Sequence, residues 1–173
     1  VVRGTTERLT QPGKIAIVTG AAGGFGEGIA RLYASEGAKV VVADINGDGA
    51  KKVASAIGEA ALAVTCDVTK RADIDALVAA ARSGFGGRVD IVVNNAGGWP
   101  PQAALDTTEE TLEGAFNFNV TTAFKLTRLC VPHMLKAGGG AVVNISSGAG
   151  RYVVPGFVAY GTAKAALSFM TRI

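Results

Sequence analysis

The sequence predicts an α/β fold in which helices cover both faces of one doubly wound, parallel β-sheet. Short apolar runs rich in valine, isoleucine and alanine alternate with longer segments of helical periodicity, and most are bounded by glycine. Parallel strands joined by helices are buried on both faces, so they lack the apolar–polar alternation of half-exposed strands. Because strand and helix alternate along the whole chain, we expect one three-layer α/β/α domain without internal repeats.

The expected elements follow one another in strict order. Strands are predicted at residues 14–19, 39–44, 61–66, 89–94 and 141–146. Helices are predicted at residues 27–36, 48–57, 69–81 and, as one long region, 107–136. Thr69 is the expected cap of the third helix, and the Thr107-Thr-Glu-Glu110 run matches a capping box. The long region is expected to bend at Asn119 and Pro132.

Composition excludes several classes of function. Of the 173 residues, 49% are hydrophobic and 18% are charged, which is typical of a packed domain. Lys and Arg are scattered and the net charge is only +3, so no nucleic-acid partner is expected. No apolar run reaches the length of a membrane span, and residues 1–13 form a polar lead-in without a signal-peptide core. We therefore expect a cytoplasmic domain at residues 14–173, with neither a nucleic-acid nor a membrane partner.

Cys66 and Cys130 are far apart in the sequence and stand in no metal-binding or redox spacing. Both are expected to be buried small hydrophobes in a reducing compartment. No metal site is predicted.

A glycine-rich loop, Thr19-Gly-Ala-Ala-Gly-Gly-Phe-Gly26, joins the first strand to the first helix. Glycines let the backbone approach a pyrophosphate, whose charge is met by N–H groups at the helix N-terminus. A merely tight turn is the alternative, but the strand before and the helix after the loop are both present. The loop predicts a dinucleotide site that includes Gly20, Gly23, Gly24, Phe25 and Gly26.

Asp44 ends the second strand, where a carboxylate can accept hydrogen bonds from the ribose hydroxyls of a dinucleotide. The same charge repels a 2′-phosphate, and neither residues 21–24 nor Ile45 supplies a cation to bind one. NAD is therefore favoured over NADP, although an ordinary capping Asp remains the alternative. Asp67 also follows a strand, and alone it is equally typical of a turn.

Tyr160 and Lys164 are four residues apart, so in a helix they lie on one face. At ~4 Å and an effective dielectric of 20, an ammonium attracts a phenolate by about 4 kcal/mol, which favours the reactive form of the tyrosine. Ser147 offers a hydroxyl that can hydrogen-bond a carbonyl or an alkoxide. Alone, the Tyr–Lys pair is more typical of a solvated helix face.

Taken together, these residues resemble the short-chain dehydrogenase/reductase family. The glycine loop, Asp67-Val68, Asn94-Asn-Ala-Gly97, Asn119, Ser147, Tyr160 and Lys164 fall in its order and approximate spacing. The resemblance covers nearly the whole chain and implies a Rossmann-like fold. It points to the branch that contains 3-oxoacyl-carrier-protein reductases and glucose dehydrogenase-like enzymes.

The resemblance implies a role for each motif. Tyr160 would be the catalytic acid/base, and Lys164 would bind the nicotinamide ribose and lower the pKa of Tyr160. Ser147, rather than Ser146, would orient the substrate oxygen. Asn119 would interrupt its helix and help to hold a water in a proton relay. The residues implied near the adenosine are Asp67, Val68, Asn95, Ala96 and Gly97.

The implied activity is NAD(H)-dependent interconversion of a secondary alcohol and a ketone by a homo-oligomer, a tetramer or a dimer, acting on a small molecule. One alternative is an NADP-dependent 3-oxoacyl-carrier-protein reductase, which Asp44 disfavours. The other is a catalytically weak nucleotide-sensing or scaffold protein, which the intact Ser147, Tyr160 and Lys164 disfavour. Because the family continues through two more strands and a substrate loop, we expect C-terminal strands to be missing from this sequence.

For two other residues, His133 and Trp99, the sequence predicts no catalytic role. His133, beside Pro132, is expected to pack or to be solvated. Trp99 begins the Trp-Pro-Pro run after Gly97-Gly98, and it either packs within its loop or lines the substrate cleft. The small apolar residues Val153, Val154 and Pro155 suit many ketones.

Overall fold

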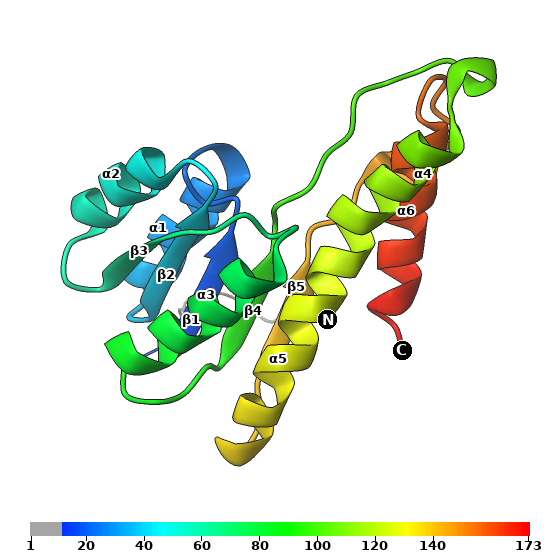
Figure 1. Ribbon diagram of the computed structural model, residues 1–173. Coiled ribbons are helices and arrows are strands. Elements are labelled where there is room, and N and C mark those ends of the chain that lie inside the picture. Colours follow the sequence, from blue (N-terminus) through cyan, green and yellow to red (C-terminus); the bar gives the residue numbers. More distant parts are fainter. Residues whose placement is uncertain (1–11) are drawn as a thin grey trace, which may run out of the picture.

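A parallel sheet of five strands, in the order β3-β2-β1-β4-β5, forms the centre of the molecule (Figure 1). The computed structural model describes residues 12–173, so most of the predicted lead-in lies outside the described residues. The strands are β1 (Ile15–Thr19), β2 (Lys39–Asp44), β3 (Ala61–Thr65), β4 (Ile91–Asn94) and β5 (Ala141–Asn144). The strand order reverses between β1 and β4, as in a doubly wound sheet. The predicted α/β fold is confirmed.

Residues 12–173 form six α-helices, five of which lie in the connections between strands. They are α1 (Gly24–Ser35), α2 (Gly47–Ile57), α3 (Arg71–Gly84), α4 (Glu109–Phe116), α5 (Thr122–Lys136) and α6 (Val158–Met170). Helices α1 and α2 pack on one face, and α3 and α5 pack on the other. Helix α6 packs beside α4 (Figure 1). No helix among residues 12–173 is long and apolar enough to cross a lipid bilayer.

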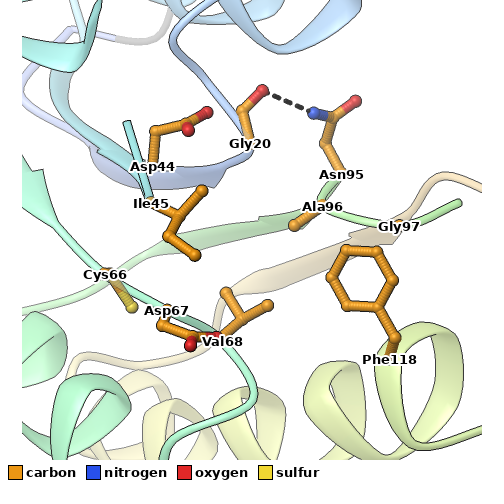
Figure 2. A pocket seen from close by; sticks show the side chains of 10 residues that line it. All are labelled: Gly20, Asp44, Ile45, Cys66, Asp67, Val68, Asn95, Ala96, Gly97 and Phe118. Atoms are coloured by element: carbon orange, nitrogen blue, oxygen red, sulfur yellow. Dashed lines mark hydrogen bonds between the residues drawn. The ribbon is translucent and has the colours of Figure 1, made fainter. Parts of the chain in front are cut away.

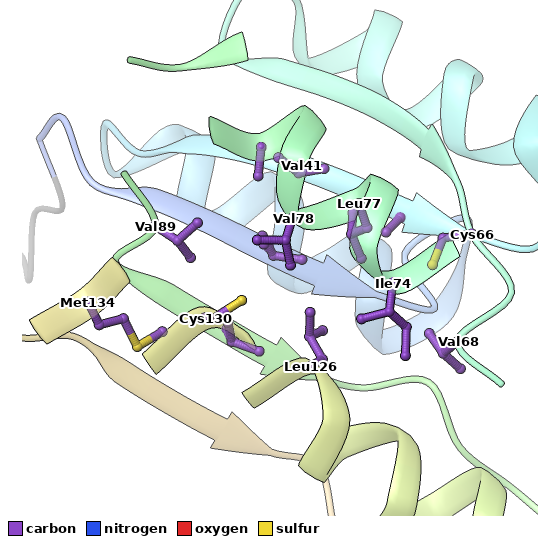
Figure 3. Packing of buried hydrophobic residues seen from close by; sticks show 14 residues of the cluster. Val41, Cys66, Val68, Ile74, Leu77, Val78, Val89, Leu126, Cys130 and Met134 are labelled. Carbon is purple, nitrogen blue, oxygen red and sulfur yellow. The ribbon is translucent and has the colours of Figure 1, made fainter. Parts of the chain in front are cut away.

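Neighbouring residues of each strand point to opposite layers of the core. Ile17, Val41 and Val92 are in register and pack with Ile74, Leu77, Val78, Leu126 and Cys130 of α3 and α5 (Figure 3). Their successors Val18, Val42 and Val93 pack in the opposite layer with Ala30, Ala50 and Val53 of α1 and α2. Because both faces of β1, β2 and β4 are buried, their sequences are continuous apolar runs.

Two helices begin later than the capping patterns predict. Thr69 does not cap α3, whose N-cap residue is Lys70. Asp67 instead accepts hydrogen bonds from the N–H and the hydroxyl of Thr69, and this local turn takes the threonine away from the helix. The cap of α4 is Thr108, which accepts from the N–H of Thr111, whereas Thr107 donates its hydroxyl to the carbonyl of Ala103.

The long region predicted at 107–136 is interrupted by a π-helical segment, Asn117–Thr121, between α4 and α5. Asn119 lies within it, so the predicted interruption at this residue is confirmed. Helix α5 runs through Pro132 and continues to Lys136.

Candidate functional site

A cavity of about 280 Å³ lies at the carboxyl ends of β1 to β4 (Figure 2). Its lining residues are Gly20, Asp44, Ile45, Cys66, Asp67, Val68, Asn95, Ala96, Gly97 and Phe118. All except Phe118 end a strand or follow one closely. Open α/β sheets bind ligands at this edge, at the point where the strand order reverses. The structure therefore brings most of the predicted nucleotide-binding residues together.

The glycine loop passes so close to its neighbours that a side chain cannot fit. A Cβ atom on Gly26 would lie 2.1 Å from the carbonyl oxygen of Gly20 and 2.6 Å from Nδ2 of Asn95. Gly20 itself has a φ of 63°, a left-handed conformation that favours glycine. Gly23, Gly24 and Phe25 do not line the cavity: they are exposed at the start of α1.

Asn95 and Thr19 fasten this loop to the turn after β4. The side-chain amide of Asn95 donates to the carbonyls of Thr19 at 2.9 Å and Gly20 at 3.0 Å, the latter drawn in Figure 2. In return, the hydroxyl oxygen of Thr19 accepts from the backbone N–H groups of Asn95 and Ala96. Two walls of the cavity are therefore fixed relative to one another.

Asp44 is held in place by backbone donors on both of its oxygens. Oδ2 accepts from the N–H of Ala22 and Oδ1 from the N–H of Asn46, each at 2.9 Å. A carboxylate oxygen has a second lone pair, so both oxygens can still accept from a ligand hydroxyl. The next residue, Ile45, is 69% exposed, so its side chain is not part of the hydrophobic core.

Asp67 and Val68 form the wall that follows β3. Hydrogen bonds from the hydroxyl and the N–H of Thr69 lower the pKa of the Asp67 carboxyl below its usual value. Asp67 Oδ2 also lies 3.4 Å from Nζ of Lys70. Val68 is buried and belongs to the core beside α3. The turn interpretation of Asp67 is therefore correct, and it does not conflict with a place in the cavity wall.

Cys66 and Phe118 line the cavity but were not predicted from the sequence. Burial, with Asp73 and Asp67 nearby, raises the pKa of the Cys66 thiol to about 11, so it stays protonated near neutral pH. Its position directly before Asp67 could have suggested it. Phe118 reaches the cavity from the π-helical segment, and no pattern in the sequence predicts that geometry.

Tyr160 and Lys164 lie on the same side of α6, as their spacing predicts. Nζ of Lys164 is 5.7 Å from the centre of the Tyr160 ring and donates to the carbonyl of Ile145 at 2.8 Å. Lys164 is only 3% exposed, and burial lowers the pKa of its ammonium group. The pair is therefore not a solvated helix face.

Gly97 joins the two parts of the site. A Cβ atom here would lie 2.8 Å from both Nζ of Lys164 and Oδ1 of Asn119. Asn119, 1% exposed, accepts from the N–H of Gly98 and donates to the carbonyls of Gly98 and Ala115. Gly97 also lines the cavity, so one wall of the cavity lies next to Lys164.

Ser147 stands at the start of a short 3₁₀ helix, Gly148–Gly150, and accepts from the N–H of Ala149. Among residues 12–173 no acceptor takes the Ser147 O–H, so this proton is available to a ligand. The hydroxyl of Ser146 points elsewhere, to the carbonyl of Lys164 and the hydroxyl of Ser168. The backbone around Ala149 touches α6 at Gly161, which brings Ser147 towards the helix of Tyr160.

The structure also shows where Trp99 and His133 lie. The Trp99 ring packs against Gly114 of α4 and joins the small cluster of Ala115, Ala159 and Ala163. His133 lies in a separate cavity with Arg82 and Lys136, away from the predicted site residues. Burial and these two cations lower the pKa of His133. Within residues 12–173, no group of three or more His, Cys, Asp or Glu side chains could hold a metal ion.

Curated proteins similar to this chain are oxidoreductases. An uncharacterized oxidoreductase of Mycobacterium tuberculosis is 44% identical over 92% of this chain, and a galactitol 2-dehydrogenase of Agrobacterium fabrum is 41% identical over 92%. A 7alpha-hydroxysteroid dehydrogenase of Escherichia coli is 40% identical over 96% of this chain. The chain spans 62% to 66% of the length of these relatives.

Solved structures share the same fold. A 7 alpha-hydroxysteroid dehydrogenase complexed with NADH and 7-oxo glycochenodeoxycholic acid has a TM-score of 0.89 at 40% identity, covering 94% of this chain and 64% of that one. A 3-ketoacyl-(acyl-carrier-protein) reductase from Brucella melitensis, complexed with NADH, has a TM-score of 0.86 at 41% identity, covering 93% and 68%. The family model described as short chain dehydrogenase matches residues 14–173. The chain therefore belongs to the short-chain dehydrogenase family.

Proposed function

We propose that this protein is an NAD(H)-dependent oxidoreductase that interconverts a secondary alcohol and a ketone. The observation that carries the proposal is the junction at Gly97, where the cavity at the sheet edge meets the buried Lys164. Tyr160 lies on the same face of the same helix as Lys164. The proposed cofactor pocket and the proposed proton donor are therefore adjacent.

The pocket residues suit a dinucleotide. Gly23 and Gly24, at the N-terminus of α1, have no neighbour within 4 Å of their Cβ positions, so a pyrophosphate can approach the backbone there. Asp44 has free lone pairs for ribose hydroxyls, and its charge disfavours the 2′-phosphate of NADP. Two similar proteins are described as NADH complexes. When bound, NAD supplies the hydride acceptor, and NADH the hydride donor.

The proton chemistry falls to this chain's own residues. In the oxidative direction, Tyr160 as a phenolate takes the proton of the substrate hydroxyl. In reduction, the Tyr160 phenol gives its proton to the developing alkoxide oxygen. Ser147 donates its free O–H to the same oxygen and thereby stabilises the negative charge. We propose that Lys164, whose Nζ lies 5.7 Å from the centre of the Tyr160 ring, binds the nicotinamide ribose and holds its positive charge beside Tyr160.

We assign Asn119 a supporting role in the proton relay. Its side-chain donors are taken by the carbonyls of Gly98 and Ala115, and its acceptor by the N–H of Gly98. A relay water next to Lys164 would therefore be held by backbone carbonyls of the π-helical segment, which Asn119 keeps in place.

We further propose a cytoplasmic homo-oligomer. The two free, buried thiols suit a reducing compartment. Large apolar side chains on α5 and α6 are exposed, among them Phe124, Val158 and Phe169, and a second copy could cover them.

The test of the activity is NADH consumption by the full-length protein against a panel of ketones, 3-oxoacyl thioesters and sugar lactones. Turnover with at least one ketone is expected. NADH binding without turnover on any substrate would contradict the proposal and favour a nucleotide-sensing protein.

Asp44→Ala tests the choice of cofactor. Removing the carboxylate takes away both the ribose contact and the repulsion of a 2′-phosphate, so the ratio of kcat/KM for NADH to that for NADPH should fall at least tenfold, about 1.4 kcal/mol. Asp48→Ala, at an exposed carboxylate on α2, is the matched control and should leave the ratio unchanged. An unchanged ratio in Asp44→Ala would refute the ribose role.

A further inference from the structure

Two loops next to Tyr160 are joined into a single surface. One follows β4 and the other follows β5, which are neighbouring strands, so both start at the edge of the sheet that holds the nucleotide cavity. Gln102 forms a parallel bridge with Phe157, and its N–H donates to the carbonyl of Gly156 at 2.8 Å. A Cβ atom on Gly156 would lie 3.5 Å from Cβ of Pro101.

Most side chains of this surface are apolar; Arg151 and Tyr152, which line the same cavity as Val154 and Phe157, are polar and exposed. We call it the apolar wall, formed by Trp99, Pro100, Pro101, Val154, Pro155 and Phe157. Phe157 brings the wall to the proposed acid/base, because the rings of Phe157 and Tyr160 are 5.6 Å apart at an angle of 56°. At the other end, Trp99 is anchored on Gly114 and remains half-buried.

The polar side chains in the loop after β4 are directed at their own backbone. The amide of Gln102 donates to the carbonyl of Asp106 at 2.7 Å, and the hydroxyl of Thr107 donates to that of Ala103 at 3.0 Å. Thr108 accepts the N–H of Thr111 and caps α4. These groups are therefore already paired and offer little to the hydroxyls of a ligand.

From this arrangement we propose the substrate class: a predominantly apolar secondary alcohol or ketone, rather than a polyol or a sugar. The inference rests on the proposed function. An alkyl or cyclic carbon skeleton gains by leaving water against the apolar wall. A polyol would leave several hydroxyls beside Trp, Pro, Val and Phe side chains without hydrogen-bond partners, and each such group lowers affinity.

The first experiment compares two alcohols with NAD on the full-length protein: 4-propylcyclohexanol and galactitol. The ratio of kcat/KM should favour the cyclohexanol by at least about 100-fold, the size expected when a site mismatches even one hydroxyl. Equal or better oxidation of galactitol would overturn the apolar class and leave the oxidoreductase proposal standing. Failure to oxidise either alcohol, or to reduce any ketone, would overturn both proposals.

A second experiment asks whether the wall touches the substrate. Val154→Asn places an amide in the wall, whereas Leu32→Asn places one on α1, at a side chain that is 62% exposed and lies outside the wall. Val154→Asn should raise the KM for 4-propylcyclohexanol about tenfold, with kcat within about twofold and the Kd for NADH unchanged. Leu32→Asn should leave all three within about twofold. An unchanged KM in Val154→Asn, or equal changes in both variants, would contradict the proposal.

Discussion

Asn119 shows how one buried side chain organises the site. Its amide takes three hydrogen bonds, two with Gly98 and one with Ala115, and it lies where a side chain on Gly97 would otherwise be. The loop after β4 therefore passes between Asn119 and Lys164 in a defined position. In this way a residue that does not line the cavity determines where the cavity meets Lys164.

We predict that Asn119→Ala lowers the free energy of unfolding by about 2–4 kcal/mol, because it leaves the buried C=O group of Ala115 and the partly buried N–H and C=O groups of Gly98 without their side-chain partner. Urea unfolding is the measurement. Asn117→Ala, at an exposed residue of the same π-helical segment, is the matched control and should stay within about 0.5 kcal/mol of the parent. Similar losses in the two variants would show that the Gly98 contacts of Asn119 contribute little.

The positions of individual site residues were predictable where chemistry and spacing coincide. The spacing of Tyr160 and Lys164 correctly predicted that they share a helix face. The position of Asp44 at the end of a strand correctly predicted that it lies in the wall of the cavity. Cys66 and Phe118 were missed because an apolar side chain in a pocket has the same sequence pattern as one in the core. The burial of Lys164 was also beyond sequence reasoning, since it depends on β5 and on the loop at Gly97.

The proposed cofactor site depends on the junction between the glycine loop and α1. Gly26 is buried under the carbonyl of Gly20, whereas Gly28, two residues further along α1, has no neighbour within 4 Å of its Cβ position. The two glycines therefore serve different purposes on the same helix. Only the first is required by close packing.

Gly26→Ala and Gly28→Ala should have opposite effects on stability. The first forces the loop away from α1 and should cost about 2 kcal/mol or more, with at least a tenfold loss of NADH affinity. The second replaces glycine at an exposed position inside α1, so it should raise the free energy of unfolding by about 0.5–1 kcal/mol without changing NADH affinity. Denaturant unfolding and NADH titration measure both quantities. Equal NADH affinity in the two variants would argue against a cofactor cradle at Gly26.

Element boundaries were harder to predict than the elements themselves. The capping patterns at Thr69 and Thr107 gave the wrong cap residues, because each threonine hydroxyl had a nearer local partner, Asp67 or the carbonyl of Ala103. A bend at Asn119 was expected from the sequence, and an interruption of the helix there from the family resemblance. Its physical cause, the bonds to Gly98, is a tertiary contact that local patterns do not encode.

For the whole molecule, we expect the free energy of unfolding to fall at alkaline pH, because a thiol is buried in one of the two core layers. Cys130 of α5 is fully buried beneath the sheet, and burial raises the pKa of its thiol from 9.0 to about 12 (Figure 3). In the folded protein the thiol stays protonated, whereas in the unfolded chain it ionises above pH ~9. The stabilisation from this thiol is therefore complete below pH ~9 and is lost as the pH rises towards 12.

The measurement that isolates this effect is urea unfolding of the parent and of Cys130→Val at pH 8, 9 and 10. The parent should lose about 1 kcal/mol more than the variant between pH 9 and pH 10. Cys66 and Lys164 titrate in both proteins, so their contributions cancel in the difference. A difference that does not change with pH would mean that the Cys130 thiol ionises in the fold as readily as in the unfolded chain.

We propose that Tyr160 moves the substrate proton beside a bound dinucleotide, and a single substitution tests this role. Steady-state turnover and NADH binding are measured on the full-length protein and on Tyr160→Phe, which removes only the phenolic O–H. We expect kcat to fall about 100- to 10,000-fold while the Kd for NADH stays within about fivefold. Turnover retained in Tyr160→Phe would rule out Tyr160 as the acid/base, because the proton would then be moved by another group.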